Sequence, residues 1–301
     1  MRLLYLIALP VAGLLASCAQ HTQQTEAALV NAEVTEPSGP VGYRTLEQLI
    51  FSPPDWPATL HGDLYLPELP GPHPTILLVH GGGWEARSRQ DMNSTARRMA
   101  RQGFAVFNVD YRFAPEFPFP AQLHDVQVAM HWLHDRAEHY QLDTDRIAAA
   151  GFSSGAHMVS LLAAVADQPT TLNTPYGGPN TRPIAVIAGG TPTDLLKFSG
   201  GRLVEQFLQG TPHEIPDVYA LASPMWHLHS NAPPFFLYHG QNDRLVPIEH
   251  STDFAHALTH FGVPHELYVM RVRGHASAFI TSQRAIDQGL NFVRRVSGAA
   301  D

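Results

Sequence analysis

The sequence predicts an α/β fold in which a mainly parallel central sheet is covered by helices on both faces. Short continuous apolar runs recur from about residue 58 onward, which is the pattern of strands buried on both faces of a sheet. Stretches with the apolar spacing of a helix lie between these runs. Regular alternation of strand and helix favours parallel pairing, and it brings the loops after the strands together at the carboxyl edge of the sheet.

The expected strands are apolar runs bounded by turn-forming residues. The first run, residues 60–66, alternates weakly and stops at Pro67, as an outer strand does. The remaining runs are continuous and cover residues 75–79, 105–109, 147–150, 184–188, 235–238 and 266–270. Each is short enough for a strand of a globular domain.

Helical spacing is clearest in residues 123–140. There Val126, Met130, Leu133 and Ala137 recur at i, i+4, i+7 and i+11 and form one apolar stripe. The other expected helices cover residues 154–166, 251–261 and 282–296. Residues 191–232 show no clear strand, so we expect a small cap or a long loop over the sheet edge there.

The amino terminus has the features of an export signal. Arg2 precedes an apolar run over residues 3–15, which is too short to span a bilayer comfortably. The following stretch, Leu15-Ala16-Ser17-Cys18, resembles the lipobox of bacterial lipoproteins. That resemblance implies a signal peptide over residues 1–17, acylation of Cys18, and a lipid-anchored protein of the bacterial cell envelope. The alternative is a plain signal peptide, cut at another small-residue site, with an incidental cysteine.

Residues 18–41 are predicted to be a flexible tether, because they are polar and lack aromatic side chains. The folded domain is then expected over residues 42–301. Cys18 is the only cysteine in the chain, which excludes an intrachain disulfide.

Composition argues against several functional classes. Nineteen Lys and Arg stand against 27 Asp and Glu, giving a net charge of −8, and no basic stripe is visible, so we expect no nucleic-acid partner. The chain has 18 histidines but no H-E-x-x-H motif and no paired cysteines, and the single pair His227 and His229 is a weak signal. We therefore expect no metal site.

The sequence Gly151-Phe152-Ser153-Ser154-Gly155 follows the apolar run at 147–150 and precedes an expected helix. A serine on a sharp strand-to-helix turn projects its hydroxyl away from the sheet, and flanking glycines allow that turn. The helix amino terminus also stabilises negative charge nearby. These features predict Ser153 as a nucleophile.

A second glycine-rich motif, His80-Gly81-Gly82-Gly83-Trp84, directly follows the run at 75–79. Successive glycines expose backbone N–H groups without side-chain obstruction, and in an acyl-transfer enzyme such donors bind the oxyanion. Ser154, the residue after the nucleophile, is expected to add its own N–H. The alternative is a flexible glycine turn, and His80 is expected to hold the loop rather than to act as a base.

A nucleophilic serine needs a base and an acid that orients the base, and in this type of fold they follow the serine in the order acid, then histidine. Asp243 lies just past the run at 235–238, and His275 lies in the loop after the run at 266–270. All three candidates therefore follow strands and are expected at one sheet edge. Asp194 is the second choice for the acid; Glu249 and Asp253 fall in an expected helix and are less suitable.

Four segments together resemble the hormone-sensitive-lipase-like esterases and the related bacterial ferulic-acid-esterase-like branch. They are residues 80–84, 110–116, 151–155 and 240–243, and the resemblance covers about residues 58–296. It implies the α/β-hydrolase fold, no cofactor, and hydrolysis of carboxylic esters with short acyl groups. By the same resemblance Ser153, Asp243 and His275 form the catalytic triad. The backbone N–H groups of Gly82, Gly83 and Ser154 form the oxyanion hole.

The nucleophile motif departs from the Gly-Asp-Ser-Ala-Gly that is usual in the lipase-like branch. That departure, together with Trp84 and His157, favours the ferulic-acid-esterase-like branch. The amino-terminal segment is also short for a helical lid, so we expect a small, open pocket. Trp84, Phe113 and the loop at 191–232 are expected to contact substrate.

Two further expectations concern residues beside the site. His157 is expected to pack against the His80 loop. The segment 110–116 contains Asp110, Arg112 and Glu116, which we expect to form an ion-paired turn.

Two other functions stay open at this point. An amide hydrolase such as an arylformamidase could use the same triad on a C–N bond. A non-catalytic binding protein could use the same scaffold. The expected substrate is a small-molecule or polysaccharide-linked ester, membrane contact is expected only through the amino-terminal anchor, and the oligomeric state is left open.

Overall fold

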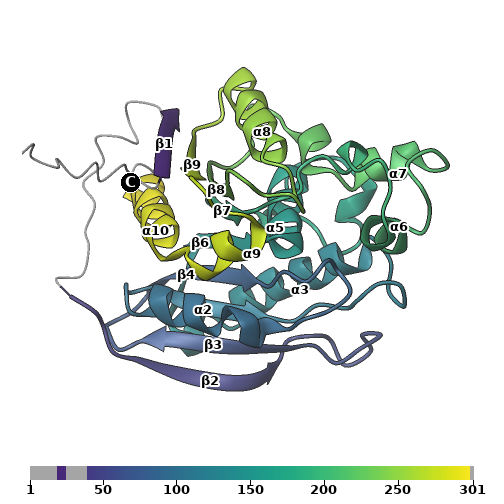
Figure 1. Ribbon diagram of the computed structural model, residues 1–301. Helices are drawn as coiled ribbons and strands as arrows, with labels where there is room; N and C mark the ends of the chain where they lie inside the picture. The colour runs from purple at the N-terminus through teal and green to yellow at the C-terminus, as the bar shows by residue number, and fades with distance from the viewer. Residues whose placement is uncertain (1–18, 25–38, 299–301) are drawn as a thin grey trace, which may run out of the picture.

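The computed structural model describes residues 19–24 and 39–298, and the described strands form one sheet (Figure 1). Its nine strands lie in the order β1-β9-β8-β7-β6-β4-β5-β3-β2. Six neighbouring strands are parallel, as predicted. They are β4 (His73–Val79), β5 (Ala105–Val109), β6 (Leu142–Phe152), β7 (Val186–Gly189), β8 (Phe235–Gly240) and β9 (His265–Met270).

On one side of the sheet, β3 (His61–Pro67) pairs antiparallel with β5, and β2 (Tyr43–Ile50) pairs antiparallel with β3. The strand at residues 60–66 is therefore not the outer strand that its sequence predicts, because β2 lies outside it. Because β3 has neighbours on both sides, nearly all of its residues are buried, whereas β2 alternates irregularly between exposed and half-buried positions. A bulge between Leu46 and Leu49 further blurs the pattern of β2.

On the other side, β1 (Ala19–Gln24) pairs antiparallel with β9, with Ala19 opposite Met270 (Figure 1). These six residues fall inside the predicted tether, and the structure places them in the sheet instead. A polar segment can join a sheet edge through its backbone N–H and C=O groups without contributing apolar side chains. The predicted signal peptide, Cys18 and residues 25–38 of the predicted tether lie outside the described residues.

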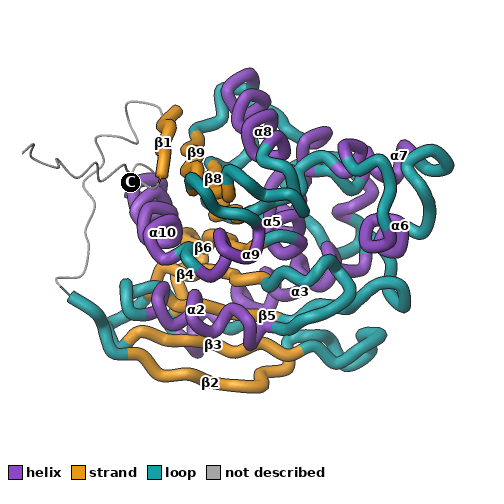
Figure 2. Tube along the Cα trace, viewed as in Figure 1, coloured by secondary structure: helices purple, strands orange, loops and turns teal. Residues whose placement is uncertain are grey.

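Helices cover both faces of the sheet (Figure 2). One face carries α3 (Ala121–Asp135), α4 (Ala137–Tyr140), α5 (Ser154–Val165) and α8 (Glu249–His260). The opposite face carries α2 (Asn93–Ala100), α9 (His275–Ile280) and α10 (Gln283–Gly298). The expected helices are all present within a few residues of their predicted bounds, and α2 and α9 were not predicted.

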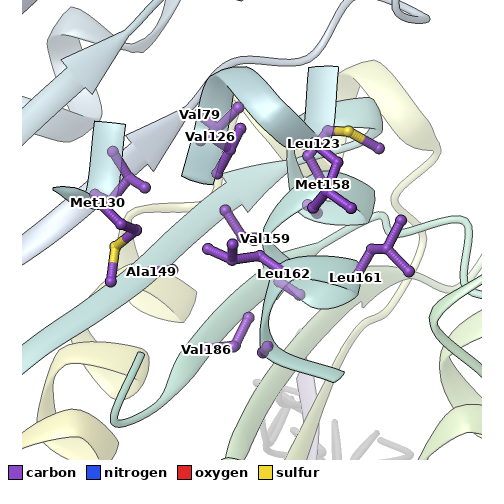
Figure 3. Packing of buried hydrophobic residues seen from close by; sticks show 14 of the residues in the cluster. Val79, Leu123, Val126, Met130, Ala149, Met158, Val159, Leu161, Leu162 and Val186 are labelled. Carbon is purple, nitrogen blue, oxygen red and sulfur yellow. The ribbon is translucent and has the colours of Figure 1, made fainter. Parts of the chain in front are cut away.

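The central strands supply side chains to two separate cores. In β4, Leu77 and Val79 join the core with α5, while Ile76 and Leu78 join the core with α10. This alternation follows from the two-residue period of a strand. Figure 3 shows Val159 and Leu162 of α5 among the side chains of the first core. All 12 residues of α5 are buried, so the helix that follows Ser153 is held on every side.

Residues 191–232 contain no strand, as predicted, and form short helices. They are η4 (Leu195–Lys197), α6 (Arg202–Leu208), α7 (Pro216–Leu221) and η5 (Pro224–His227). This segment lies beside α5, which η5 contacts directly. It therefore forms a small cap at the carboxyl edge.

No helix in the described part of the chain is both long enough and apolar enough to cross a bilayer. Nor do three or more metal-binding side chains gather anywhere among the residues that the structure describes.

Candidate active site

Ser153 lies at the turn between β6 and α5, with a backbone φ of 56° and ψ of −124°. Glycines make this turn possible. A Cβ on Gly155 would lie 2.2 Å from the carbonyl oxygen of Val79, and one on Gly151 would lie 2.5 Å from the backbone of Gly155. The Ser153 N–H donates to the carbonyl of Gly189 on β7 at 2.8 Å, which fixes the turn against the sheet. The serine is thus held in a conformation unusual for a residue with a side chain.

Ser153, His275 and Asp243 form one hydrogen-bonded chain. The Ser153 Oγ lies 2.9 Å from the His275 Nε2, and the His275 Nδ1 lies 2.6 Å from the Asp243 Oδ2. They follow β6, β9 and β8, whose carboxyl ends share one edge. With its Nδ1–H donating to the carboxylate, a neutral His275 presents an Nε2 lone pair to the serine hydroxyl. This arrangement can take a proton from Ser153.

Asp243 is buried but well supplied with donors. Its Oδ1 accepts the N–H groups of Leu245 and Val246, both at 2.9 Å, and its Oδ2 accepts from His275. Burial alone raises the pKa of Asp243, but the contacts with His239 and His275 and the Val246 N–H outweigh it. The pKa therefore lies well below its usual range. The carboxylate is charged at neutral pH.

His239 is a residue that the sequence analysis did not single out. It is fully buried at the end of β8, and its Nε2 lies 3.3 Å from the Asp243 Oδ2. Because the carbonyl of Val246 can only accept, the Nε2 carries the proton and donates to it at 2.8 Å. The Nδ1 then accepts from the Ser251 hydroxyl at 2.7 Å. His239 thus braces the loop that holds Asp243.

The loop after β4 brings Gly82 and Gly83 to the same cavity as Ser153 and Ser154. Both glycines have positive φ, at 134° and 63°, and a Cβ on Gly82 would lie 2.0 Å from the Ala86 carbonyl oxygen. Among the described residues, none accepts a hydrogen bond from the N–H of Gly82 or Gly83. Ser154 begins α5, so its N–H has no partner within the helix. These groups are available to an oxyanion in the cavity.

Trp84 fixes this loop from behind. Its ring stacks on Phe207 at 4.5 Å, and its Nε1–H donates to the His157 Nδ1 at 3.2 Å. The His157 Nε2–H in turn donates to the carbonyl of Ala222 at 2.7 Å. Trp84 borders the cavity, as expected of a substrate contact, but it is only 4% exposed, so most of its surface serves the packing. His157 packs against this loop through Trp84.

His80 lies beneath the same loop. It is fully buried, stacks on Tyr111 at 4.4 Å, and its Nδ1 lies 2.7 Å from the carbonyl of Gly81. Burial lowers the pKa of His80, so the ring is neutral and donates to that carbonyl. His80 thus holds the loop.

Phe113 differs from its expected role. It does not belong to the cavity lining; its ring packs edge-on against Tyr111 at 5.4 Å and near His80 at 6.0 Å. These contacts place the ring beside His80, the residue that holds the glycine loop. It therefore supports the loop rather than contacting substrate.

The residues of the segment 110–116 form ion pairs, as expected, but their partners lie outside the segment. Asp110 pairs with Arg89, and the buried Arg112 pairs with the buried Asp125 at 2.7 Å. Glu116 is exposed and forms no ion pair with a described residue. Both pairs tie the segment to neighbouring elements.

Asp194, the second choice for the acid, does not contact His275. Its side chain accepts from the Leu196 N–H at 3.2 Å and from the Trp226 Nε1–H at 3.3 Å. It therefore caps η4.

Ser153 and His275 lie at the wall of a cavity of about 790 Å³, in the upper part of the range typical of small-molecule sites. The small pocket that we expected is therefore larger in the structure. Polar side chains on its wall include Arg87, Asp91 and Arg202. The 191–232 segment, expected to contact substrate, contributes Phe198, Leu203 and Val204 to the apolar wall. The sequence analysis did not single out the other large apolar side chains there, which are Met92, Phe152, Leu245, Val246, Phe279 and Ile280.

Comparison with known proteins gives one matching family and several related esterases. The BD-FAE family model matches residues 62–258. Esterase LipC of Mycobacterium tuberculosis is 31% identical over 197 residues, which cover 62% of this chain and 48% of LipC. Esterase LipQ of the same organism is 29% identical over 209 residues, covering 67% of this chain and 49% of LipQ. The chain therefore spans about half the length of these curated relatives.

A solved structure described as a truncated form of a carbohydrate esterase from gut microbiota has the same fold. It superposes with a TM-score of 0.76 at 22% identity, and the match covers 87% of this chain and 99% of that one. The family match, the strand order and this superposition agree with one another. The chain belongs to the BD-FAE family and has the α/β-hydrolase fold.

Proposed function

We propose that the protein is a serine carboxylesterase that works through an acyl-enzyme. The observation that carries this proposal is the hydrogen-bonded chain from Ser153 through His275 to Asp243. It lies in a large cavity beside the Gly82 and Gly83 N–H groups, which have no acceptor among the described residues. The names of its relatives LipC and LipQ, both esterases, support the same chemistry. No metal or cofactor enters the proposal.

The steps follow from the geometry. His275 takes the proton of Ser153 while the Oγ attacks the ester carbonyl. The N–H groups of Gly82, Gly83 and Ser154 stabilise the oxyanion, and their fixed positions make reorganisation unnecessary. His275 then gives its proton to the leaving alcohol, and a water molecule, deprotonated by His275, hydrolyses the acyl-enzyme. Throughout, the Asp243 carboxylate stabilises the positive charge on His275.

We propose short acyl groups attached to a bulkier alcohol. A cavity of about 790 Å³ is larger than a short acyl group requires, so most of it is available to the alcohol part of the substrate. The description of the gut-microbiota structure as a carbohydrate esterase supports an acylated saccharide as one such substrate.

The test measures hydrolysis of p-nitrophenyl esters from acetate to palmitate. We expect turnover to be highest for short chains and to fall by several orders of magnitude in Ser153→Ala. Ser160→Ala is the matched control, because Ser160 lies on α5 and its buried hydroxyl has no partner among the described residues. Folded protein without ester turnover would refute the esterase proposal. Turnover of an aryl formamide by the same protein would then indicate the amide hydrolase.

We also propose that the protein is exported and anchored to the cell envelope by acylation of Cys18. The observation behind this proposal is the lipobox-like Leu15-Ala16-Ser17-Cys18. Labelled palmitate supplied to expressing cells should enter the wild-type protein and not Cys18→Ala. Equal labelling of both would exclude this site.

A further inference from the structure

Three neighbouring segments at the carboxyl edge expose apolar side chains around the cavity. Leu245 in the loop 241–246 is 57% exposed, Val272 in the loop 271–274 is 75% exposed, and Ile280 at the end of α9 is 67% exposed. Leu245 and Ile280 also line the cavity. We call residues 241–246, residues 271–274 and α9 together the carboxyl-edge surface.

Hydrogen bonds join the three segments into one surface. The Asn242 N–H donates to the Arg273 carbonyl at 2.8 Å, which connects the two loops. The Arg273 Nε donates to the Thr281 hydroxyl at 3.1 Å, which connects the second loop to the end of α9. The segments that carry the exposed apolar side chains are therefore adjacent at the carboxyl edge.

Val272 adopts a conformation that is rare for its residue type. Its φ is 62°, and a β-branched residue in the left-handed region is a genuine outlier. The fold keeps this conformation although it places an apolar side chain in solvent. Strain of this kind gathers at functional positions.

The charge on this surface is positive. Its sequence contains Arg244, Arg271 and Arg273, and its only carboxylate is the buried Asp243. Arg244 and Arg271 are exposed, and neither forms an ion pair with a described residue. The chain as a whole is acidic, with a net charge of −8, so this basic face is a local departure. Arginines interspersed with exposed apolar side chains suit the headgroups and upper acyl chains of an anionic bilayer.

The position of β1 gives an independent argument for the same face. Ala19, the first residue of β1, pairs with Met270, directly before the loop that carries Val272. Figure 1 shows β1 beside β9. In the sequence Ala19 follows Cys18, where acylation is proposed. The described chain therefore begins at the carboxyl edge, one residue after the proposed acylation site, and this argument rests on the lipid anchor proposed above.

We propose that the carboxyl-edge surface contacts an anionic lipid bilayer, so that the cavity opens toward the membrane. The bilayer would cover Leu245, Val272 and Ile280, while the arginines would bind lipid phosphates. A substrate would then reach Ser153 from the membrane side. The proposal goes beyond ester hydrolysis and can be tested without turnover.

The test uses the full chain in vesicles of phosphatidylcholine and phosphatidylglycerol, with nitroxide quenchers on the lipid acyl chains. A fluorophore is attached in Val272→Cys and, as the matched control, in Leu69→Cys. Leu69 is 42% exposed and lies between β3 and β4, at the opposite edge of the sheet. The unsubstituted chain gives the background from Cys18. We expect strong quenching at position 272 and little at position 69. Equal quenching, or none at position 272, would overturn the proposal.

A second variant distinguishes contact with lipid from contact with another protein molecule at the carboxyl-edge surface. Arg244→Glu combined with Arg271→Glu should lower quenching at position 272 several-fold, and vesicles of phosphatidylcholine alone should have a similar effect. Quenching that is unchanged by both would refute the role of the arginines. Protection of the position 272 fluorophore without lipid, with a dimer in sedimentation velocity, would replace the bilayer with a second copy of the chain.

Discussion

Acid should destabilise this protein through His157, which holds the glycine loop of residues 80–84 in place through Trp84. His157 is fully buried, and burial lowers its pKa from 6.5 to about 4. The contacts explain why it stays neutral: the Nδ1 must accept from the Trp84 indole, so it cannot carry a proton without losing that bond. In the unfolded chain the same imidazole is free to take up a proton near pH 6.5.

The sign follows from which state binds more protons. Between pH 6.5 and 4 the unfolded chain holds a proton on His157 that the folded protein lacks, so the free energy of unfolding falls as the pH falls. Above about pH 6.5 His157 is neutral in both states, so it no longer lowers the free energy of unfolding. At pH 5 the loss amounts to about 2 kcal/mol, and below pH 4 it levels off at roughly 3 kcal/mol. Such a loss is a large part of the stability of an ordinary domain.

The assay is urea unfolding at several values between pH 8 and pH 4, comparing the wild type with His157→Gln. Glutamine can accept from Trp84 and donate to the Ala222 carbonyl but does not titrate. Other buried histidines titrate in both proteins, so the difference between the two isolates His157. We expect the wild type to lose about 2 kcal/mol relative to the variant between pH 8 and pH 5. Parallel stability curves would refute the reasoning.

Three further changes test the site and its frame. Asp243→Asn should lower kcat about 10⁴-fold while leaving the fold intact, because an amide cannot hold His275 in its attacking tautomer. A loss of only a few-fold in kcat, measured with p-nitrophenyl acetate, would contradict that role. His239→Leu should lower kcat about tenfold or more with little change in KM, because the Asp243 loop loses its brace, and His239→Gln should recover part of the loss by restoring an N–H. Identical kinetics of the two His239 variants would show that only the volume of the side chain matters. Gly155→Ala should lower the free energy of unfolding by about 2 kcal/mol or more, because its Cβ would meet the Val79 carbonyl oxygen at 2.2 Å. Gly39→Ala, with no atom within 4 Å of the added Cβ, is the control for that unfolding experiment.

The strands that the sequence predicted well are those buried on both faces. Residues 75–79 and 105–109 are apolar except for the buried Thr75 and Asn108, because each strand faces a helix layer on either side. The edge strands behave differently, since β2 contains Glu47 and Gln48 and β1 reads Ala-Gln-His-Thr-Gln-Gln. Their pairing depends on backbone hydrogen bonds to another strand, which is β3 for β2 and the sequence-distant β9 for β1. No local pattern records that neighbour.

In the candidate site, too, some features could be predicted from the sequence and others could not. The positions of Ser153, Asp243 and His275 could be predicted because each follows a recognisable strand, and the chain order of such groups is constrained. The direction of a side chain within a loop could not be predicted in that way. Phe113 was expected in the pocket because its segment is close to the site, yet its ring turns toward Tyr111. Phe198 and Leu203 line the cavity because tertiary packing folds the 191–232 segment over it.

That segment and the oxyanion loop are mechanically linked, which limits how substrate preference can change. Trp84 follows the glycines of the loop, stacks on Phe207 of α6, and bonds through His157 to the Ala222 carbonyl after α7. In addition, a Cβ on Gly83 would lie 3.0 Å from Leu203. Any rearrangement of α6 that widens the cavity therefore also moves Trp84, which packs behind the proposed oxyanion donors. Loss of one donor costs roughly 3 kcal/mol of transition-state stabilisation, so a shift of the cap is expected to change kcat together with KM.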